Sequence, residues 1–180
     1  MTASEVGRGT VIDYGEYTLA GKAAFFWLVN HNEDGSLGSD YFSGNQVSIC
    51  VPGTFNGSML VNYFYQDSLG NYGVKRYLAD LGGGLGAVLP NGSCDAKGAL
   101  VGTEPEKSLL LTVTPIFSGV KVSIKADADF PSQGKEIVAL GQTGEMGSGG
   151  VARRVRVLKR YQLPDFMLEA ITASVSIGGN

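Results

Sequence analysis

Ser58-Met-Leu-Val-Asn-Tyr-Phe-Tyr-Gln66 decides the fold class of this chain. The stretch is rich in β-branched and aromatic residues, as strands are, and the turn-forming pair Asn56-Gly57 precedes it. Similar runs recur on both sides with a period of two residues and predict about ten strands. They are Thr10–Leu19, Ala23–Val29, Gln46–Val51, Tyr72–Leu78, Leu109–Thr114, Val120–Lys125, Lys135–Leu140, Val151–Tyr161 and Met167–Ile177.

The strand pattern predicts an all-β protein, an antiparallel β-sandwich that forms a single domain over residues 1–180. The chain of 180 residues has the length of one domain, and 43% hydrophobic residues suffice for a core. Asp34-Gly35 and Phe117-Ser118-Gly119 are expected to form hairpin turns. We expect long loops at Gly82–Gly86 and Pro90–Gly102, and at most one helical turn at Pro164–Ile171.

The charge argues against a basic nucleic-acid binder, and the motifs argue against an enzyme. The formal net charge is −3, from 14 basic and 17 acidic residues, which excludes a generally basic nucleic-acid binder. The single histidine, His31, has no Gly-x-Ser-x-Gly nucleophile motif to serve. Gly82-x-Gly84-x-x-Ala87 resembles a dinucleotide loop, but the Pro-containing sequence after it cannot continue as the helix that such a loop needs. We therefore expect a non-enzymatic protein.

The two cysteines bear on the compartment. Cys50 and Cys94 are predicted to form a disulfide, which would close a loop of about 45 residues and contribute about 4 kcal/mol. The alternative is two buried free thiols in a cytosolic protein. The longest apolar run, Ala23–Val29, is far shorter than the roughly 20 residues of a membrane span. Without an export signal in the chain, the disulfide predicts a longer parent protein that carries the anchor.

A candidate calcium loop lies at Asn30-x-Asn32-x-Asp34-Gly35. Alternate side-chain oxygens followed by glycine are typical of the first half of such a loop. The first ligand is a neutral Asn, and the twelfth position is Tyr41 instead of Glu. The alternative, which we favour, is an Asx-rich hairpin turn.

Five of the fourteen basic residues fall in Arg153–Arg160. If this segment is a strand, Val155 and Val157 are expected to face the core, while Arg154, Arg156 and Arg160 form an outward stripe. Such a stripe is a candidate site for DNA or an acidic glycan, and the alternative is a solvated edge strand protected by its charge. Tyrosines 63, 65 and 72 are candidates for stacking on sugar rings, although core packing would also explain them.

Two segments resemble a known family. Gly150–Phe166 is similar to the closing segment of type IV pilin-like (minor pilin) proteins, in which Arg-x-Val-x-Val alternation leads to Leu-Pro and an aromatic residue. Here Arg154 to Val157 supply the alternation, Leu163-Pro164 the turn and Phe166 the aromatic residue. Phe26–Gly38 resembles the first core strand and loop of such ectodomains in candidate-phylum bacteria. The resemblance covers the outer ends of the chain.

The resemblance implies an extracellular domain on a parent with an N-terminal hydrophobic helix, which packs into a type IV pilus with other pilin subunits. It implies a structural role in pilus assembly, or cell adhesion or DNA capture at a filament tip, with no catalytic residues and no membrane contact by this part of the chain. The alternative is a secreted carbohydrate-binding module or a phage-fibre-like domain. Saturable binding to a host-surface glycan would distinguish the alternative from the pilin-like reading.

Overall fold

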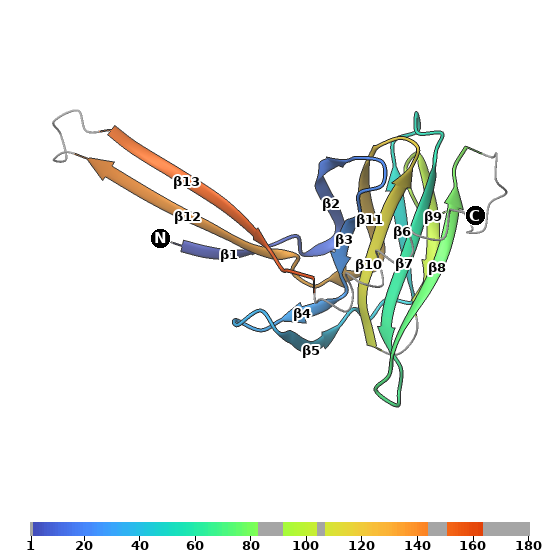
Figure 1. Cartoon of the computed structure of the whole chain (residues 1–180). Helices are drawn as coiled ribbons and strands as arrows, with labels where there is room; N and C mark the ends of the chain where they lie inside the picture. The colour runs from blue at the N-terminus through green and yellow to red at the C-terminus, as the bar shows by residue number, and fades with distance from the viewer. Residues whose placement is uncertain (1, 83–91, 104–106, 144–150, 164–180) are drawn as a thin grey trace.

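The computed structural model describes residues 2–82, 92–103, 107–143 and 151–163. All regular structure in these ranges is β, in thirteen strands. Two four-stranded antiparallel sheets form a sandwich, and a three-stranded arm and a short hairpin are attached to it (Figure 1). The prediction of an all-β antiparallel sandwich is confirmed.

The first sheet has the order β3-β10-β7-β8. Its strands are β3 (Ala24–Trp27), β10 (Lys107–Ile116), β7 (Ser58–Gln66) and β8 (Tyr72–Asp80). Strand β10 is buried along almost its whole length, so its apolar run packs on both faces of the sheet.

The second sheet has the order β2-β11-β6-β9. Its strands are β2 (Gly9–Thr18), β11 (Val120–Phe130), β6 (Gln46–Val51) and β9 (Lys97–Gly102). The main core lies between the two sheets, because alternate residues of both point inward. Its fully buried side chains include Phe26, Met59, Val61, Tyr63 and Leu111 from the first sheet and Val47, Ile49, Val101 and Ile124 from the second.

A second, smaller apolar cluster lies apart from the main core. Trp27, Val29, Phe64, Leu109 and Leu110 are buried in it. The hairpin of β4 (Val29–His31) and β5 (Leu37–Tyr41) packs against this cluster, and so do Tyr161 and Leu163 beyond the last strand. This cluster is therefore where the end of the arm joins the sandwich.

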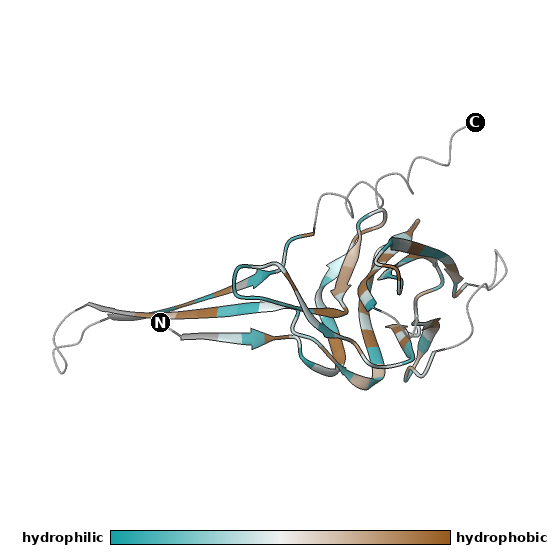
Figure 2. Cartoon of the chain, turned by 90° about the horizontal axis from the view of Figure 1, so that it is seen from below, coloured by the Kyte–Doolittle hydropathy of each residue, from teal (hydrophilic) through white to brown (hydrophobic). Residues whose placement is uncertain are grey.

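The arm consists of β1 (Thr2–Val6), β12 (Gly134–Thr143) and β13 (Val151–Arg160), with β12 in the middle. Both ribbon views show it standing out from the sandwich as a long, narrow ribbon (Figures 1 and 2).

Some element predictions were correct and others were wrong. The bounds of β6 and β7 coincide with the predicted runs. The predicted hairpin at Phe117–Gly119 is wrong, because this turn joins β10 to β11 and these two strands lie in different sheets. The predicted loop Pro90–Gly102 is wrong in its last part, because Lys97–Gly102 pairs with β6 as β9. The run Ala23–Val29 divides at Leu28 into β3 and β4. The predictions for Pro164–Ile171 and Met167–Ile177 lie outside the described residues.

Candidate functional site: the projecting arm and its root

The arm is a sheet without a core behind it. Leu140, Val155 and Val157 are 70%, 54% and 49% exposed, so three large apolar side chains of the arm lie open to solvent. The register pairs Ile137 with Val157 and Ala139 with Val155, so these four side chains lie on one face of the arm. Exposed apolar side chains on a projecting element are typical of a contact surface.

The prediction that Val155 and Val157 face the core is wrong. The period of two in Arg154 to Val157 correctly indicates a strand with an apolar and a charged face. Its apolar face meets solvent, because the arm leaves the sandwich and the core of the sandwich does not lie behind it. A period of two in the sequence indicates that the two faces of a strand differ in polarity, but it does not indicate whether the core or solvent lies against the apolar face.

The structure places the three predicted arginines on one face of β13, but in three different environments. Arg154 is exposed and sits opposite Leu140. Arg156 forms an ion pair with Glu136 of the neighbouring strand. Arg160 donates to the Tyr14 carbonyl and lies over the Tyr14 ring at 4.1 Å from the centroid. Two of the three charges are thus engaged within the molecule, which leaves Arg154 as the most available cation of the stripe.

Gln133 fastens the start of the arm to the sandwich. Its side-chain amide accepts a hydrogen bond from Trp27 N at 2.7 Å and donates one to Trp27 O at 2.9 Å. Strand β3 is an edge strand, so the amide occupies the place of a neighbouring strand there. The Gln133 backbone also donates to Val6 O at 2.8 Å. Gln133 therefore joins both β1 and the start of β12 to the edge of the first sheet.

His31 fastens the other end of the arm. Its ring stacks on Tyr161 with the centroids 3.8 Å apart and meets Trp27 edge-on at 4.4 Å. Both ring nitrogens are buried without a hydrogen-bond partner among the described residues. This burial lowers the pKa of His31 from 6.5 to about 4, so the ring is neutral at physiological pH. The single histidine has a packing role at the arm root.

The candidate calcium residues form the turn of the β4–β5 hairpin. Asn30 exchanges hydrogen bonds with Asp40, and Asn32 donates to Ser36 Oγ at 3.0 Å. Asp34 accepts from both the backbone and the hydroxyl of Ser36, which lowers the pKa of its carboxyl. This is the Asx-rich turn of the alternative interpretation, with Gly35 at a φ of +89°. Calcium binding stays a prediction, and a rise in melting temperature on adding calcium would test it.

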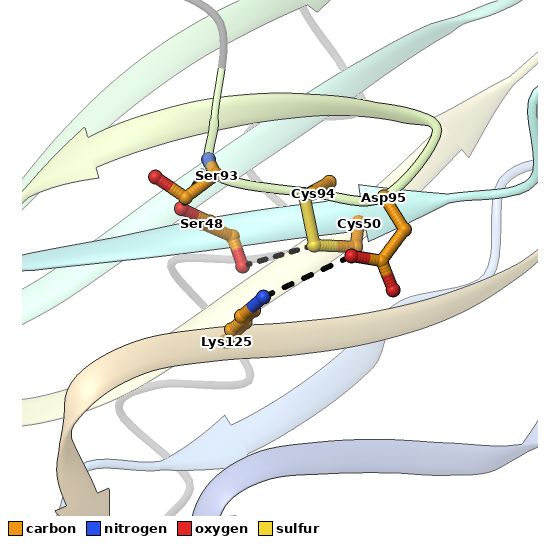
Figure 3. The surroundings of a disulfide bond; sticks show 6 residues. All are labelled: Ser48, Cys50, Ser93, Cys94, Asp95 and Lys125. Atoms are coloured by element: carbon orange, nitrogen blue, oxygen red, sulfur yellow. Dashed lines mark hydrogen bonds and ion pairs between the residues drawn. A yellow bond between two sulfur atoms is a disulfide. The ribbon is translucent and has the colours of Figure 1, made fainter.

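Cys50 and Cys94 form the predicted disulfide, with their Cα atoms 5.5 Å apart. Around it, Ser93 N donates to Ser48 Oγ at 2.9 Å, and Asp95 lies 3.9 Å from Lys125 Nζ (Figure 3). Gly98, the register partner of Cys50, is required here, because a Cβ at this position would collide with the sulfur of Cys94. A disulfide of this kind indicates a non-cytoplasmic protein.

The three candidate tyrosines do not form a common surface. Tyr63 is fully buried and hydrogen-bonded to Ser108 at 2.7 Å. Tyr65 is half-buried and stacks on Tyr63 with the ring centroids 5.8 Å apart, and only Tyr72 is exposed. Core packing therefore explains the first two.

A hollow of about 450 Å³ lies where the arm meets the sandwich. Aromatic and charged side chains line it, among them Tyr14, Phe25, Phe26, Asp13, Glu16, Glu136, Arg156 and Arg160.

Sequence reasoning did not single out Gln133, Trp27 or Tyr161 at this root. The turn-forming sequence around Pro131 was a local signal for a bend, but no pattern indicated which backbone Gln133 would contact.

Comparison with known proteins gives no match: no family model fits the chain, and no curated protein or solved structure is significantly similar to it. In the described ranges there is also no helix long and apolar enough to cross a membrane.

Proposed function

We propose that this chain is a non-enzymatic extracellular domain of a type IV pilin-like protein, and that it serves filament assembly or contact at a filament tip through its projecting arm. The observation that carries the proposal is the arm itself, a three-stranded ribbon that leaves the sandwich with apolar side chains exposed on it. An element without its own core acquires one when it packs against a partner.

Three further observations support a structural role outside the cytoplasm. The Cys50–Cys94 disulfide suits an oxidising compartment. Gln133 and His31 hold the root of the arm against the sandwich, as a structural contact through the arm requires. Among the described residues, the groups with a lowered pKa are His31, Asp34 and Asp67. His31 packs on an aromatic ring, Asp34 lies in the β4–β5 turn, and Asp67 lies in the β7–β8 turn, where it accepts from the backbone of Asn71.

Surface labelling tests the proposal. Antibodies raised against the chain should label filaments or the cell surface of source cells in immunogold electron microscopy. External protease should remove the label from intact cells. Label confined to the cytoplasm would overturn the proposal.

DNA capture is the tip function that the exposed Arg154 favours. Binding to duplex DNA should weaken steeply with salt and should weaken further in Arg154→Ala, because phosphate contacts release counterions. Lys121→Ala removes an exposed cation on β11 of the sandwich, away from the arm, and is the matched control. Equal binding by both variants, or binding that is independent of salt, would exclude capture by the arm and leave assembly as the function.

A further inference from the structure

Strand β3 has one edge that is only partly covered. It lies at the end of the first sheet and pairs with β10 alone. Leu28, just after β3, donates to Leu109 O, so every second residue of β3 turns its backbone groups towards β10. Phe25 and Trp27 turn theirs to the open side. Gln133 covers Trp27 there, but no described residue forms a hydrogen bond with the backbone of Phe25.

The hollow of about 450 Å³ lies against this open edge. It is bounded by β3 and by β2, the edge strand of the second sheet. Figure 1 shows both strands on the side of the sandwich from which the arm leaves. Phe25 and Tyr14 line the hollow with their ring centroids 6.1 Å apart. The site thus offers unpaired backbone groups beside an aromatic surface, which is what a peptide needs in order to add to a sheet as a further strand.

The charge of the hollow favours a cationic strand. Its lining holds three carboxylates, those of Asp13, Glu16 and Glu136, against the guanidinium groups of Arg156 and Arg160. Glu136 is paired with Arg156. Asp13 and Glu16 are exposed and form no ion pair among the described residues. A strand that alternates apolar and basic side chains would therefore fit both the aromatic and the acidic parts of the lining.

Strand β13 has this pattern. Val155 and Val157 are exposed on one face, Lys159 is exposed on the same face, and Arg154 is exposed on the other. Among the described residues, β13 pairs only with β12, so its outer edge is free. Its pairing with β12 directs it away from the sandwich of its own chain (Figure 1). The β3 edge of one chain can therefore receive this strand from another copy.

We propose that the arm of one copy binds in the hollow of the next copy, with β13 added to the open edge of β3. The inference deepens the proposed assembly role and rests on it. The donor surface is the arm and the acceptor surface is the hollow, so the contact is heterologous. Each bound copy keeps one free arm or one free hollow, and the contact therefore builds an open chain of subunits.

Charge selects this contact over pairing between two β13 strands. Adjacent strands lie about 4.8 Å apart, so β13 pairing would place two cationic strands at that distance. Lysine and arginine on an edge strand oppose such pairing. In the hollow, the same cations meet Asp13 and Glu16 instead. The charges that keep two arms apart thus direct the arm to the β3 edge.

Sedimentation velocity on the unmodified protein tests the assembly. Species larger than a dimer should appear and grow in size as the concentration rises from micromolar to millimolar. Added salt should shorten the chains, because exposed charge pairs are screened. A monomer at millimolar concentration, or growth that stops at a dimer, would overturn the proposal.

Charge reversal identifies the two surfaces. Asp13→Lys with Glu16→Lys makes the hollow cationic, and Arg154→Glu with Lys159→Glu makes the arm anionic. Neither double variant should form chains alone, because its arm and hollow then carry like charges. An equimolar mixture should form chains again, because each arm meets a hollow of opposite charge, and this recovery also shows that both variants fold. Circular dichroism checks each variant alone. Two folded variants that stay monomeric when mixed would contradict the proposed contact.

Matched reversals at exposed positions outside the proposed contact are the controls. Asp127→Lys with Asp129→Lys on β11 changes the net charge as much as the hollow variant does. Lys22→Glu with Lys107→Glu matches the arm variant. Both controls should form chains like the unmodified protein. Equal loss in the controls would show that net charge, and not the arm in the hollow, governs association.

Hydrogen exchange locates the added strand. The Phe25 amide should exchange about tenfold more slowly when nine-tenths of the hollows are filled. The Phe26 amide already faces β10 and should change little. Slowing at β8, an edge strand on the other side of the sheet, in place of Phe25 would overturn the proposal.

These measurements separate the inference from the proposed function. If the chain labels filaments but stays monomeric, the arm-in-hollow contact fails and the assembly role stands on other contacts. If the chain assembles as described but is confined to the cytoplasm, the contact stands and the filament role fails.

Discussion

At the residue scale, His31 makes stability depend on pH. Its folded pKa of about 4 lies below the unfolded value of 6.5. Between these values the unfolded chain binds more protons than the folded one, so the folded state loses stability as the pH falls from about 6.5 towards 4. Below about pH 4 both states are protonated at this group, and its contribution stops changing.

A comparison with His31→Phe isolates this effect, because phenylalanine keeps an aromatic ring between Trp27 and Tyr161 but does not titrate. The free energy of unfolding, measured by urea denaturation from pH 7.5 to pH 4, should fall more steeply in the unmodified protein than in the variant. Parallel pH profiles would show that the histidine is not held neutral at the arm root.

Gln133 is the residue whose loss should most directly loosen the arm. Gln133→Ala removes both hydrogen bonds to the Trp27 backbone and leaves that edge unpaired. An unsatisfied buried group costs about 1–3 kcal/mol, and the free energy of unfolding should fall by that amount. Gln162→Ala, at an exposed glutamine beyond the same arm, is the control and should be close to neutral. Equal losses in both variants would contradict the role assigned to Gln133.

At the scale of elements, the link between β1 and β2 depends on Gly7. Its φ is +70°, and a Cβ there would collide with the side chain of Gln133. Gly21 has a φ of +75° with open space around it, so the two glycines share the backbone cost but not the collision.

Gly7→Ala should therefore destabilise the protein more than Gly21→Ala. The left-handed backbone costs each variant about 1–2 kcal/mol, and the collision adds to that cost only at Gly7. Chemical denaturation of both variants measures the difference. If Gly21→Ala lost as much stability as Gly7→Ala, the collision with Gln133 would contribute nothing to the destabilisation.

The elements also show how far sequence reasoning reaches. Strands β6 and β7 were predicted with correct bounds because buried strands are dense in β-branched and aromatic residues. Strands β1, β5 and β9 are short and are missing from the prediction. Thr2–Val6 and Leu37–Tyr41 mix polar and small residues, and Lys97–Gly102 begins and ends near glycines. Strands β1 and β9 form through pairing partners distant in sequence, β12 and β6, and β5 forms through its hairpin with β4. The composition of a segment does not indicate such partners.

The candidate site was less predictable than the fold. The disulfide followed from counting cysteines, and the Asn30–Gly35 turn followed from its residue types. The arm did not, because an exposed ribbon and a core strand share the same alternation of Arg and Val. An exposed ribbon and a core strand differ only in whether other elements pack against their apolar face, and this depends on how the whole chain folds.

At the scale of the whole molecule, the disulfide links the two ends of the chain segment that runs from the second sheet through the first sheet and back. The chain leaves the second sheet at the end of β6, passes through β7 and β8 of the first sheet, and returns to the second as β9. Cys50 lies at the point of departure and Cys94 just before the return. The bridge thus ties together the two ends of a segment that contains two strands of the opposite sheet, and its loss frees both ends.

Replacing both cysteines by serine should therefore lower the stability of the whole sandwich. Cross-linking across 44 positions removes about 4 kcal/mol of chain entropy from the unfolded state. For a chain of this length that corresponds to a fall in melting temperature of roughly 8–16 °C. Scanning calorimetry of the double variant, with the unmodified protein in reductant as a second route to the same state, measures it. The arm is attached through Trp27 and Tyr161, away from the bridge, so its root contacts should survive at temperatures below the new transition. If the hydrogen exchange of β12 rose as much as that of β9 in the folded variant, the arm and the sandwich would be one cooperative unit, and the arm root would not be independently braced.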